Sequence, residues 1–134
     1  FKQKVFFENQ TFDAYSFLSD LIRSANKSIT VIDNFIDDSV LIHLAKKNTS
    51  VIVKIYTNKI SPQLKLDTKK FNEQYGKLEI KEFANSHDRF LIIDDHKIYH
   101  FGASLKDLGK KWFVCTLLDS EATLMLTKLI RKEI

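Results

Sequence analysis

The spacing of apolar residues predicts that helices and strands alternate through the first half of the chain. Thr11 to Asn26 carries apolar side chains three and four positions apart, which indicates an amphipathic helix with Thr11 as its N-cap. Ser28 to Asp33 is a β-branched run typical of a strand, Phe35 to Lys47 is a second helix, and Val51 to Thr57 is a further strand. This strand, helix and strand predict a βαβ unit with parallel neighbouring strands.

The same patterns extend the prediction over the whole chain and give an α/β fold class. The remaining elements are expected at Lys4–Glu8 (strand), Gln63–Tyr75 (helix ended by Gly76), Leu78–Ala84 (strand), His87–Asp94 and Lys97–Phe101 (strands), Trp112–Leu118 (buried strand) and from Asp119 or Ser120 to Ile134 (helix). We therefore expect a mixed sheet flanked by helices, in the order β-α-β-α-β-α-β-β-β-β-α.

Composition limits the class of protein. A chain of 134 residues with 44% hydrophobic and 28% charged residues predicts one globular domain spanning residues 1–134. The net charge of +4 is a mild bias toward polyanions. No stretch approaches the ~18 consecutive apolar residues of a membrane span, and no signal peptide is visible. Because Phe1 already lies in a strand-like segment, we expect a domain excised from a longer protein.

The single cysteine, Cys115, lies in an apolar run and excludes an intrachain disulfide. This fits a reducing compartment, so we expect a cytoplasmic protein with Cys115 as a buried strand residue.

The candidate chemistry gathers between Ser86 and Trp112. On a strand, residues two apart share a face, so His87 and Arg89 are expected side by side at the strand's start. A neutral imidazole next to a guanidinium suits phosphate chemistry, because the cation can hold a diester oxygen while the imidazole attacks or transfers a proton. We interpret this pair as a phosphate site.

A glycine-bordered loop follows the next strand. Gly102 and Gly109 allow close backbone approach to a ligand, and Ser104 and Lys106 between them add a hydroxyl and an ammonium group. A hairpin turn through residues 95–97 is expected to bring this loop back to His87, so that both segments form one pocket.

The pattern His87-x-Arg89-x4-Asp94, followed by a Gly-Ala-Ser loop at Gly102, resembles the H-x-K-x4-D and G-S-x-N signature of the phospholipase D superfamily. The resemblance implies that two such motifs face each other, that one histidine becomes phosphorylated while the other protonates the leaving oxygen, and that no metal or other cofactor is needed. Superfamily members with one motif per chain resemble nucleases and pair as homodimers. This chain has one motif, so the resemblance implies a twofold homodimer.

Three departures from the signature leave turnover open. Arg89 replaces the family's lysine, Leu105 or Lys106 falls where the family has asparagine, and the region that often carries an acid to orient the histidine reads Gly-Lys-Lys-Trp from Gly109 to Trp112. The added lysines favour phosphate binding.

Other residues have two interpretations. Lys110, Lys111 and Trp112 form either a phosphate clamp with a stacking platform or a charged turn before a buried tryptophan. Asp94 is either a structural acid that accepts backbone hydrogen bonds at the hairpin turn, which we favour, or a catalytic acid.

A group of carboxylates and amides follows the second strand. Asp37 and Asp38 are read as acids at a helix N-terminus, and Asp33 and Asn34 as the turn out of a strand, rather than as a metal site. Asn34 is a candidate for the rim of the pocket, since sites in α/β sheets lie at the carboxyl ends of strands.

Three hypotheses for function remain. The first is a metal-independent phosphodiesterase acting on nucleic acid, with His87 as nucleophile or acid, Arg89 holding the diester, and Ser104 and Lys106 completing the oxyanion contacts. The second is a catalytically degenerate DNA-binding or dimerisation module, since the segment from Gly102 to Phe113 resembles domains of larger bacterial and phage-derived DNA-binding proteins. A lipid phosphodiesterase ranks last, because no amphipathic membrane-facing segment stands out.

Overall fold

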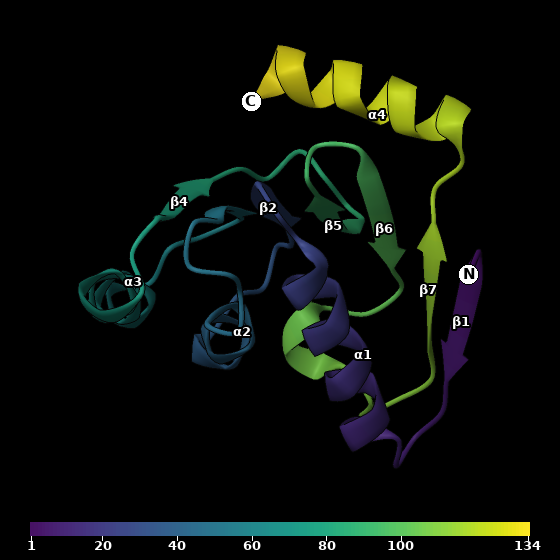
Figure 1. Ribbon diagram of the computed structural model, residues 1–134, viewed down its shortest axis with the longest axis horizontal. Coiled ribbons are helices and arrows are strands. Elements are labelled where there is room, and N and C mark those ends of the chain that lie inside the picture. The colour runs from purple at the N-terminus through teal and green to yellow at the C-terminus, as the bar shows by residue number, and fades with distance from the viewer.

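A seven-stranded mixed sheet organises the protein in a computed structural model that describes all residues from 1 to 134 (Figure 1). The elements are β1 (Gln3–Phe6), α1 (Thr11–Ser24), β2 (Ser28–Ile32), α2 (Asp38–Leu44), β3 (Ile52–Thr57), α3 (Pro62–Gln74), β4 (Leu78–Glu82), β5 (Arg89–Ile93), β6 (Lys97–Phe101), a 3-10 turn η1 (Leu105–Asp107), β7 (Phe113–Leu117) and α4 (Ser120–Glu133). The order of strands and helices is the one that the sequence predicts.

The sheet has the strand order β1-β7-β6-β5-β2-β3-β4. Strands β2, β3 and β4 are parallel neighbours, which confirms the predicted βαβ unit. Strand β5 runs antiparallel to β2 and pairs with β6 through the predicted hairpin, and β7 and β1 continue the antiparallel half. The strand carrying Arg89 therefore lies at the centre of the sheet, beside the first parallel strand.

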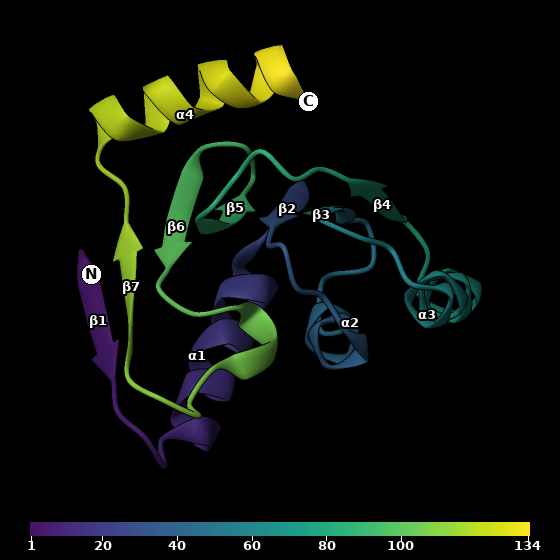
Figure 2. The same cartoon turned by 180° about the vertical axis from the view of Figure 1, so that it is seen from behind.

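Three helices cover one face of the sheet and one helix lies over the other. Figures 1 and 2, which view the molecule from opposite sides, both show α1, α2 and α3 on one side and α4 on the other. The predicted apolar stripe of α1 packs into a core of 25 buried residues that includes Leu18 and Ile22. Under α4 the buried cluster is only Ile32, Tyr56, Ile92 and Ile98.

The prediction that Thr11 caps α1 is wrong. The N-cap position is Gln10, without a side-chain capping bond, because the side-chain Oε1 of Gln10 instead accepts the Phe7 N–H at 2.6 Å. Thr11 lies inside the first turn, and its hydroxyl donates to the carbonyl of Gly109 at 3.4 Å. The threonine therefore links the helix to the glycine-bordered loop.

Helix α2 is shorter than the predicted segment from Phe35 to Lys47. It begins at Asp38, because the Asp37 carboxylate accepts the Ser39 N–H at 3.0 Å and so caps the helix there. This confirms the interpretation of Asp37 and Asp38 as acids of a helix N-terminus.

The last strand begins one residue later than predicted. Of the two interpretations of Trp112, burial is wrong, because its side chain is 70% exposed and β7 starts at the buried Phe113. Cys115 is fully buried in this strand, as predicted, and burial raises the pKa of its thiol to about 12. Asp119 caps α4 by accepting the Ala122 N–H at 2.8 Å.

The apolar stripe of α4 packs incompletely. None of its residues is fully buried, and Met125 and Leu129 are 67% and 53% exposed. No helix in the structure combines the length and the apolar character that crossing a lipid bilayer requires.

Candidate functional site

Arg89 opens β5, whereas His87 precedes the strand. Leu91 and Ile93 lie in the large core with the helices, and Phe90 and Ile92 face α4, so the predicted alternation holds along the strand itself. His87 and Asp88 form a bend before the first ladder pair, Arg89 with Phe101. The alternation rule therefore does not extend to His87, and its position is set by the loop.

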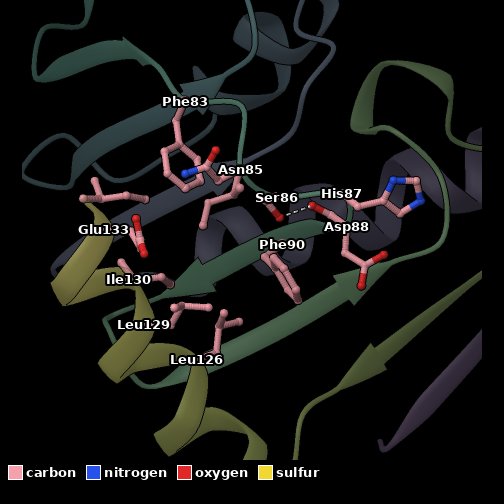
Figure 3. Close-up of a pocket in the computed structure, with 12 residues that line it drawn as sticks. Phe83, Asn85, Ser86, His87, Asp88, Phe90, Leu126, Leu129, Ile130 and Glu133 are labelled. Atoms are coloured by element: carbon pink, nitrogen blue, oxygen red, sulfur yellow. Dashed lines mark hydrogen bonds between the residues drawn. The ribbon is translucent and has the colours of Figure 1, made fainter.

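Hydrogen bonds hold the backbone of this loop in place. The Asn34 side-chain amide donates to the Ser86 carbonyl at 2.9 Å, and the Ser86 hydroxyl donates to the Asp88 carbonyl at 2.8 Å. The His87 side chain is exposed and makes no hydrogen bond within the chain. Figure 3 shows its ring pointing away from the apolar side chains of α4. Asn34 thus supports the loop that displays His87.

The Arg89 guanidinium reaches the glycine-bordered loop. One of its terminal nitrogens donates to the Gly102 carbonyl at 2.8 Å, while Nε is buried and has no hydrogen-bond partner. The Asp33 carboxylate lies close enough for electrostatic attraction to this cation. Arg89 is thereby held beside the loop and keeps donor capacity that no group of the chain uses.

Asp33 is the buried acid that organises the loop. It is fully buried, and its carboxylate accepts the Leu105 N–H at 2.8 Å and the Phe35 N–H at 3.0 Å. Burial raises the pKa of Asp33 above its ordinary value, and the hydrogen bonds and Arg89 offset only part of that rise. Sequence reasoning treated Asp33 as a turn residue. The available signal was its place directly after the apolar pair Val31 and Ile32, with which the strand ends.

Ser104 lies inside the loop rather than on its surface. It is only 6% exposed, and its hydroxyl lies 2.9 Å from the Asp33 carboxylate and 3.0 Å from the Phe35 carbonyl. Both partners are acceptors, so the single hydroxyl proton is shared between them. This arrangement ties the loop to the end of β2 and makes Ser104 part of the cleft wall.

The two glycines of the loop approach protein backbone. Gly109 has φ +82°, and a Cβ placed there would lie 2.5 Å from the Thr11 Cα. A Cβ at Gly102 would lie 3.3 Å from the Val114 carbonyl oxygen. The close approach expected for a ligand is therefore used, at both positions, to pack the loop against α1 and β7.

A cationic cleft of about 410 Å³ lies in front of this loop. Its lining residues come from the β2 exit, the start of β5 and the loop to β7: Phe35, Arg89, Gly102, Ala103, Ser104, Asp107, Lys110, Lys111 and Trp112. The lining of the cleft therefore contains three cationic side chains and one carboxylate. An excess of positive charge in a concave site attracts anions.

Asp107 neutralises part of this charge. Its carboxylate lies 3.0 Å from the Lys106 ammonium and 3.1 Å from the Lys110 ammonium. Burial acts to raise the pKa of Asp107, but the hydrogen bonds from the two lysines outweigh it, and the pKa is lowered. The bond to Asp107 also raises the pKa of Lys106. Lys111 has no carboxylate partner, so its charge is available to a ligand.

Two exposed aromatic rings border the cleft. Trp112 is 70% exposed and Phe35 is 59% exposed. The indole N–H of Trp112 donates to the Glu8 carboxylate, and its ring meets the Phe7 ring edge to face at 5.8 Å between centroids. These contacts orient the indole while most of its surface stays open.

The structure brings together some of the predicted site residues and separates others. Arg89, Ser104, Lys110 and Lys111 line one cleft, whereas His87 lies outside its lining and Lys106 is turned to Asp107. His87 instead borders a cavity of about 340 Å³ between its loop and α4 (Figure 3). The expected single pocket is therefore a cleft with the histidine on the neighbouring surface.

Asp94 has the structural role that the sequence predicts, with different partners. Its carboxylate accepts the N–H groups of Asn26, Lys27 and Ser28 at 2.7 to 3.1 Å. Asn26 and Lys27 lie in the loop between α1 and β2 and Ser28 begins β2, so none of these donors belongs to the hairpin turn. Burial acts to raise the pKa of Asp94, but the three backbone donors outweigh it, and the pKa is lowered.

No group of three or more histidine, cysteine, aspartate or glutamate side chains has the geometry to hold a metal ion. The functional groups available are a guanidinium and two lysine ammonium groups around the cleft, and an exposed imidazole on the neighbouring surface.

Comparison with known proteins identifies the fold. No protein-family model and no curated protein matches the sequence. Among solved structures, NucT from Helicobacter pylori superposes with a TM-score of 0.70 at 16% identity, covering 98% of this chain and 94% of that one.

Larger proteins contain the same fold. TrmBL2, an archaeal chromatin protein, gives a TM-score of 0.62 at 16% identity, and polyphosphate kinase from Porphyromonas gingivalis gives 0.62 at 10%. Each alignment covers 98% of this chain, but only 52% and 22% of those proteins. NucT and polyphosphate kinase have phospholipase D superfamily folds, and the present chain has the same phospholipase D-like fold, as the His87 and Arg89 motif predicts.

Proposed function

We propose that this domain recognises the phosphodiester backbone of nucleic acid and cleaves it without a metal, at a site shared by two copies in a homodimer. The observation that carries the proposal is the cationic cleft, in which Arg89, Lys110 and Lys111 face one carboxylate. The Arg89 guanidinium makes one hydrogen bond within the chain, from a terminal nitrogen to the Gly102 carbonyl, so its other terminal N–H groups can donate to a phosphate oxygen. The exposed His87 lies two residues away.

The proposed reaction proceeds in two displacements. In the first, a ring nitrogen of His87 attacks phosphorus, the bond from phosphorus to the leaving oxygen breaks, and a second imidazolium gives that oxygen its proton. In the second, the same second imidazole takes a proton from water, the water oxygen attacks the phosphohistidine, and His87 is released. Arg89 and Lys111 stabilise the charge that develops on the other phosphate oxygens.

The second imidazole has to come from another molecule. His87 has no hydrogen-bonding partner within the chain, and no other histidine lines the cleft or the cavity that His87 borders. A twofold axis close to this loop would place two copies of His87 opposite each other. The homodimer expected from the sequence motif would thereby complete the site.

The fold comparison supports a role in nucleic-acid chemistry. NucT is a phospholipase D-like nuclease, and TrmBL2 is described as showing a novel mode of DNA binding. For the present chain these likenesses support nucleic acid as the partner, in agreement with the positive cleft.

Incubation with DNA and with a chromogenic phosphodiester in EDTA tests the enzyme. We expect turnover in the wild type that is lost, by at least a hundredfold, in His87→Ala. His96→Ala is the matched control, because His96 is also exposed and binds only the Asp94 carbonyl in the hairpin turn. Equal activity in wild type and His87→Ala would contradict the assignment of His87.

Sedimentation tests the shared site separately. We expect a dimer at the concentrations at which the enzyme turns over, and loss of specific activity on dilution below its dissociation constant. A monomer that turns over at full rate would rule out the need for a second His87.

A catalytically inactive DNA-binding module is the second candidate, and Leu105 favours it. Leu105 is one of the two positions where the family signature has asparagine, and it is 3% exposed in the core, so it cannot contact a phosphate. In this case we expect no turnover, but DNA binding whose affinity falls steeply with salt. The variant Lys111→Ala is then expected to flatten the salt dependence.

A further inference from the structure

We infer that the cleft takes single-stranded nucleic acid, with bases stacked on Trp112 and Phe35 while Arg89, Lys110 and Lys111 hold the phosphates. This inference rests on the proposed function and narrows its substrate class. The two rings come from separate segments, the residue before β7 and the loop after β2, and both line the cleft that holds the cations.

The exposure of the rings is the first argument. A large aromatic side chain next to a strand is ordinarily buried, yet Trp112 is 70% exposed and Phe35 is 59% exposed. Phe113, the neighbour of Trp112, is buried and stacks on Phe6 with 4.9 Å between ring centroids. The fold therefore directs one ring into the core and leaves the adjacent ring beside the cleft.

The orientation of Trp112 is the second argument. Its N–H donates to Glu8, and Phe7 contacts its ring edge to face. A ring that is already oriented loses little conformational entropy when a base stacks on it. These contacts thus hold the exposed indole in an orientation in which a flat ligand can stack on it.

The pairing of aromatic and cationic groups is the third argument. Lys110 and Lys111 directly precede Trp112, and Arg89 lies in the same cleft as Phe35. Proteins that bind single strands combine a positive groove for the backbone with aromatic platforms for the bases. In a duplex the base faces are stacked on each other, so the rings would have no base to contact.

Binding of three probes in fluorescence anisotropy tests the inference: a short oligothymidylate, an abasic oligomer of equal length, and the corresponding duplex. All carry phosphates, and only the first offers unstacked bases. We expect oligothymidylate to bind at least tenfold more tightly than the abasic oligomer and than the duplex, because stacking of even one base is worth about this factor. Trp112 is the only tryptophan of the chain, so its fluorescence should be quenched by oligothymidylate and unchanged by the abasic oligomer.

Substitutions locate the platforms. Trp112→Ala and Phe35→Ala should each weaken oligothymidylate binding by roughly five- to a hundredfold and leave abasic binding unchanged, and Trp112→Phe should restore most of the loss. Tyr75→Ala is the matched control, since Tyr75 is 44% exposed at the end of α3 and outside the cleft. Circular dichroism of each variant checks that the fold is retained.

The outcomes separate this inference from the function on which it rests. If the abasic oligomer or the duplex binds as tightly as oligothymidylate, or if both ring variants bind like wild type, the stacking inference is wrong and the phosphate site stands. If no probe binds even at low salt, the proposed nucleic-acid function itself is wrong.

Discussion

The two faces of the sheet differ in how completely they are covered. Helices α1, α2 and α3 close one face over a core of 25 buried residues, whereas α4 covers four buried residues on the other face and buries none of its own. Strand β5 has side chains on both faces. Leu91 is fully buried on the closed face, and the neighbouring Phe90 is half-buried on the open face.

Because of this difference, the residues that stabilise the fold and the residues of the candidate site lie in different parts of the molecule. Apolar burial is the main source of folding free energy, so the closed face holds the structure together. The His87 loop and the groove between Asp88, His100 and α4 lie on the open face, and the cationic cleft lies at the strand ends beside both. Residues that bind a partner must remain accessible, and the residues that we propose to bind nucleic acid lie where packing is incomplete.

The largest effect is expected on the closed face. Leu91→Ala should lower the free energy of unfolding by about 2–5 kcal/mol, because it removes a fully buried side chain and leaves a cavity among well-packed neighbours. Urea denaturation measures the change. A loss below 1 kcal/mol would show that the two faces do not differ as the packing indicates.

Asp94 tests the polar contact that joins the hairpin to the loop before β2. Asp94→Asn should cost about 1–2 kcal/mol at neutral pH, because three backbone N–H groups lose a charged acceptor. The carboxylate pKa is lowered in the folded protein, so its stabilisation is present above the ordinary value of 3.8 and is lost as pH falls through the folded pKa.

Urea titrations of wild type and Asp94→Asn at several pH values check this. We expect the difference in stability to be full at neutral pH and to shrink below about pH 3.8. A difference that stays constant down to the lowest pH at which the protein folds would contradict the role of the charge.

The matched leucine on the open face should matter less. Leu126→Ala, on α4, is expected to cost at most about 1 kcal/mol, because the side chain is half-buried and its site can relax into solvent. The same urea titration as for Leu91→Ala gives the comparison. A cost equal to that of Leu91→Ala at concentrations at which sedimentation detects the proposed dimer would indicate that a second copy covers α4.

The smallest effect on stability is expected at the proposed nucleophile. His87→Ala should change the free energy of unfolding by no more than about 0.5 kcal/mol, since the ring is exposed and makes no hydrogen bond in the chain. Thermal unfolding measures this beside the activity assay. A large loss would mean that the loop needs the imidazole for its structure, and loss of turnover could then not be assigned to chemistry.

Local patterns predicted most of the fold. The period of α1, the β-branched runs and the turn residues predicted every α-helix and strand in order, because a buried helix face or strand face requires apolar residues at a regular spacing. Errors occurred at the ends. Thr11 lies inside the first turn of α1, because the Gln10 side chain holds the turn before the helix, and α2 begins at Asp38 and not at Phe35, because Asp37 caps it.

The candidate site was predictable only in part. The spacing of His87, Arg89 and Asp94 predicted the fold and the acid that binds backbone N–H groups. Such local spacing is enough, because these residues lie on or next to one strand and the hairpin turn that follows it. Burial of Asp33 and Ser104 depends on two segments separated by 71 positions, and no local pattern records that contact.

The sequence by itself determined the order of elements, the positive charge and the motif, because each of these follows from neighbouring residues. The tertiary structure alone decided that Arg89 joins Lys110, Lys111 and two open aromatic rings in one cleft, and that His87 lies on the surface beside it. The reason is physical: which side chains meet at the ends of strands depends on how the sheet pairs and on what the helices cover, and these arise only when the whole chain has packed.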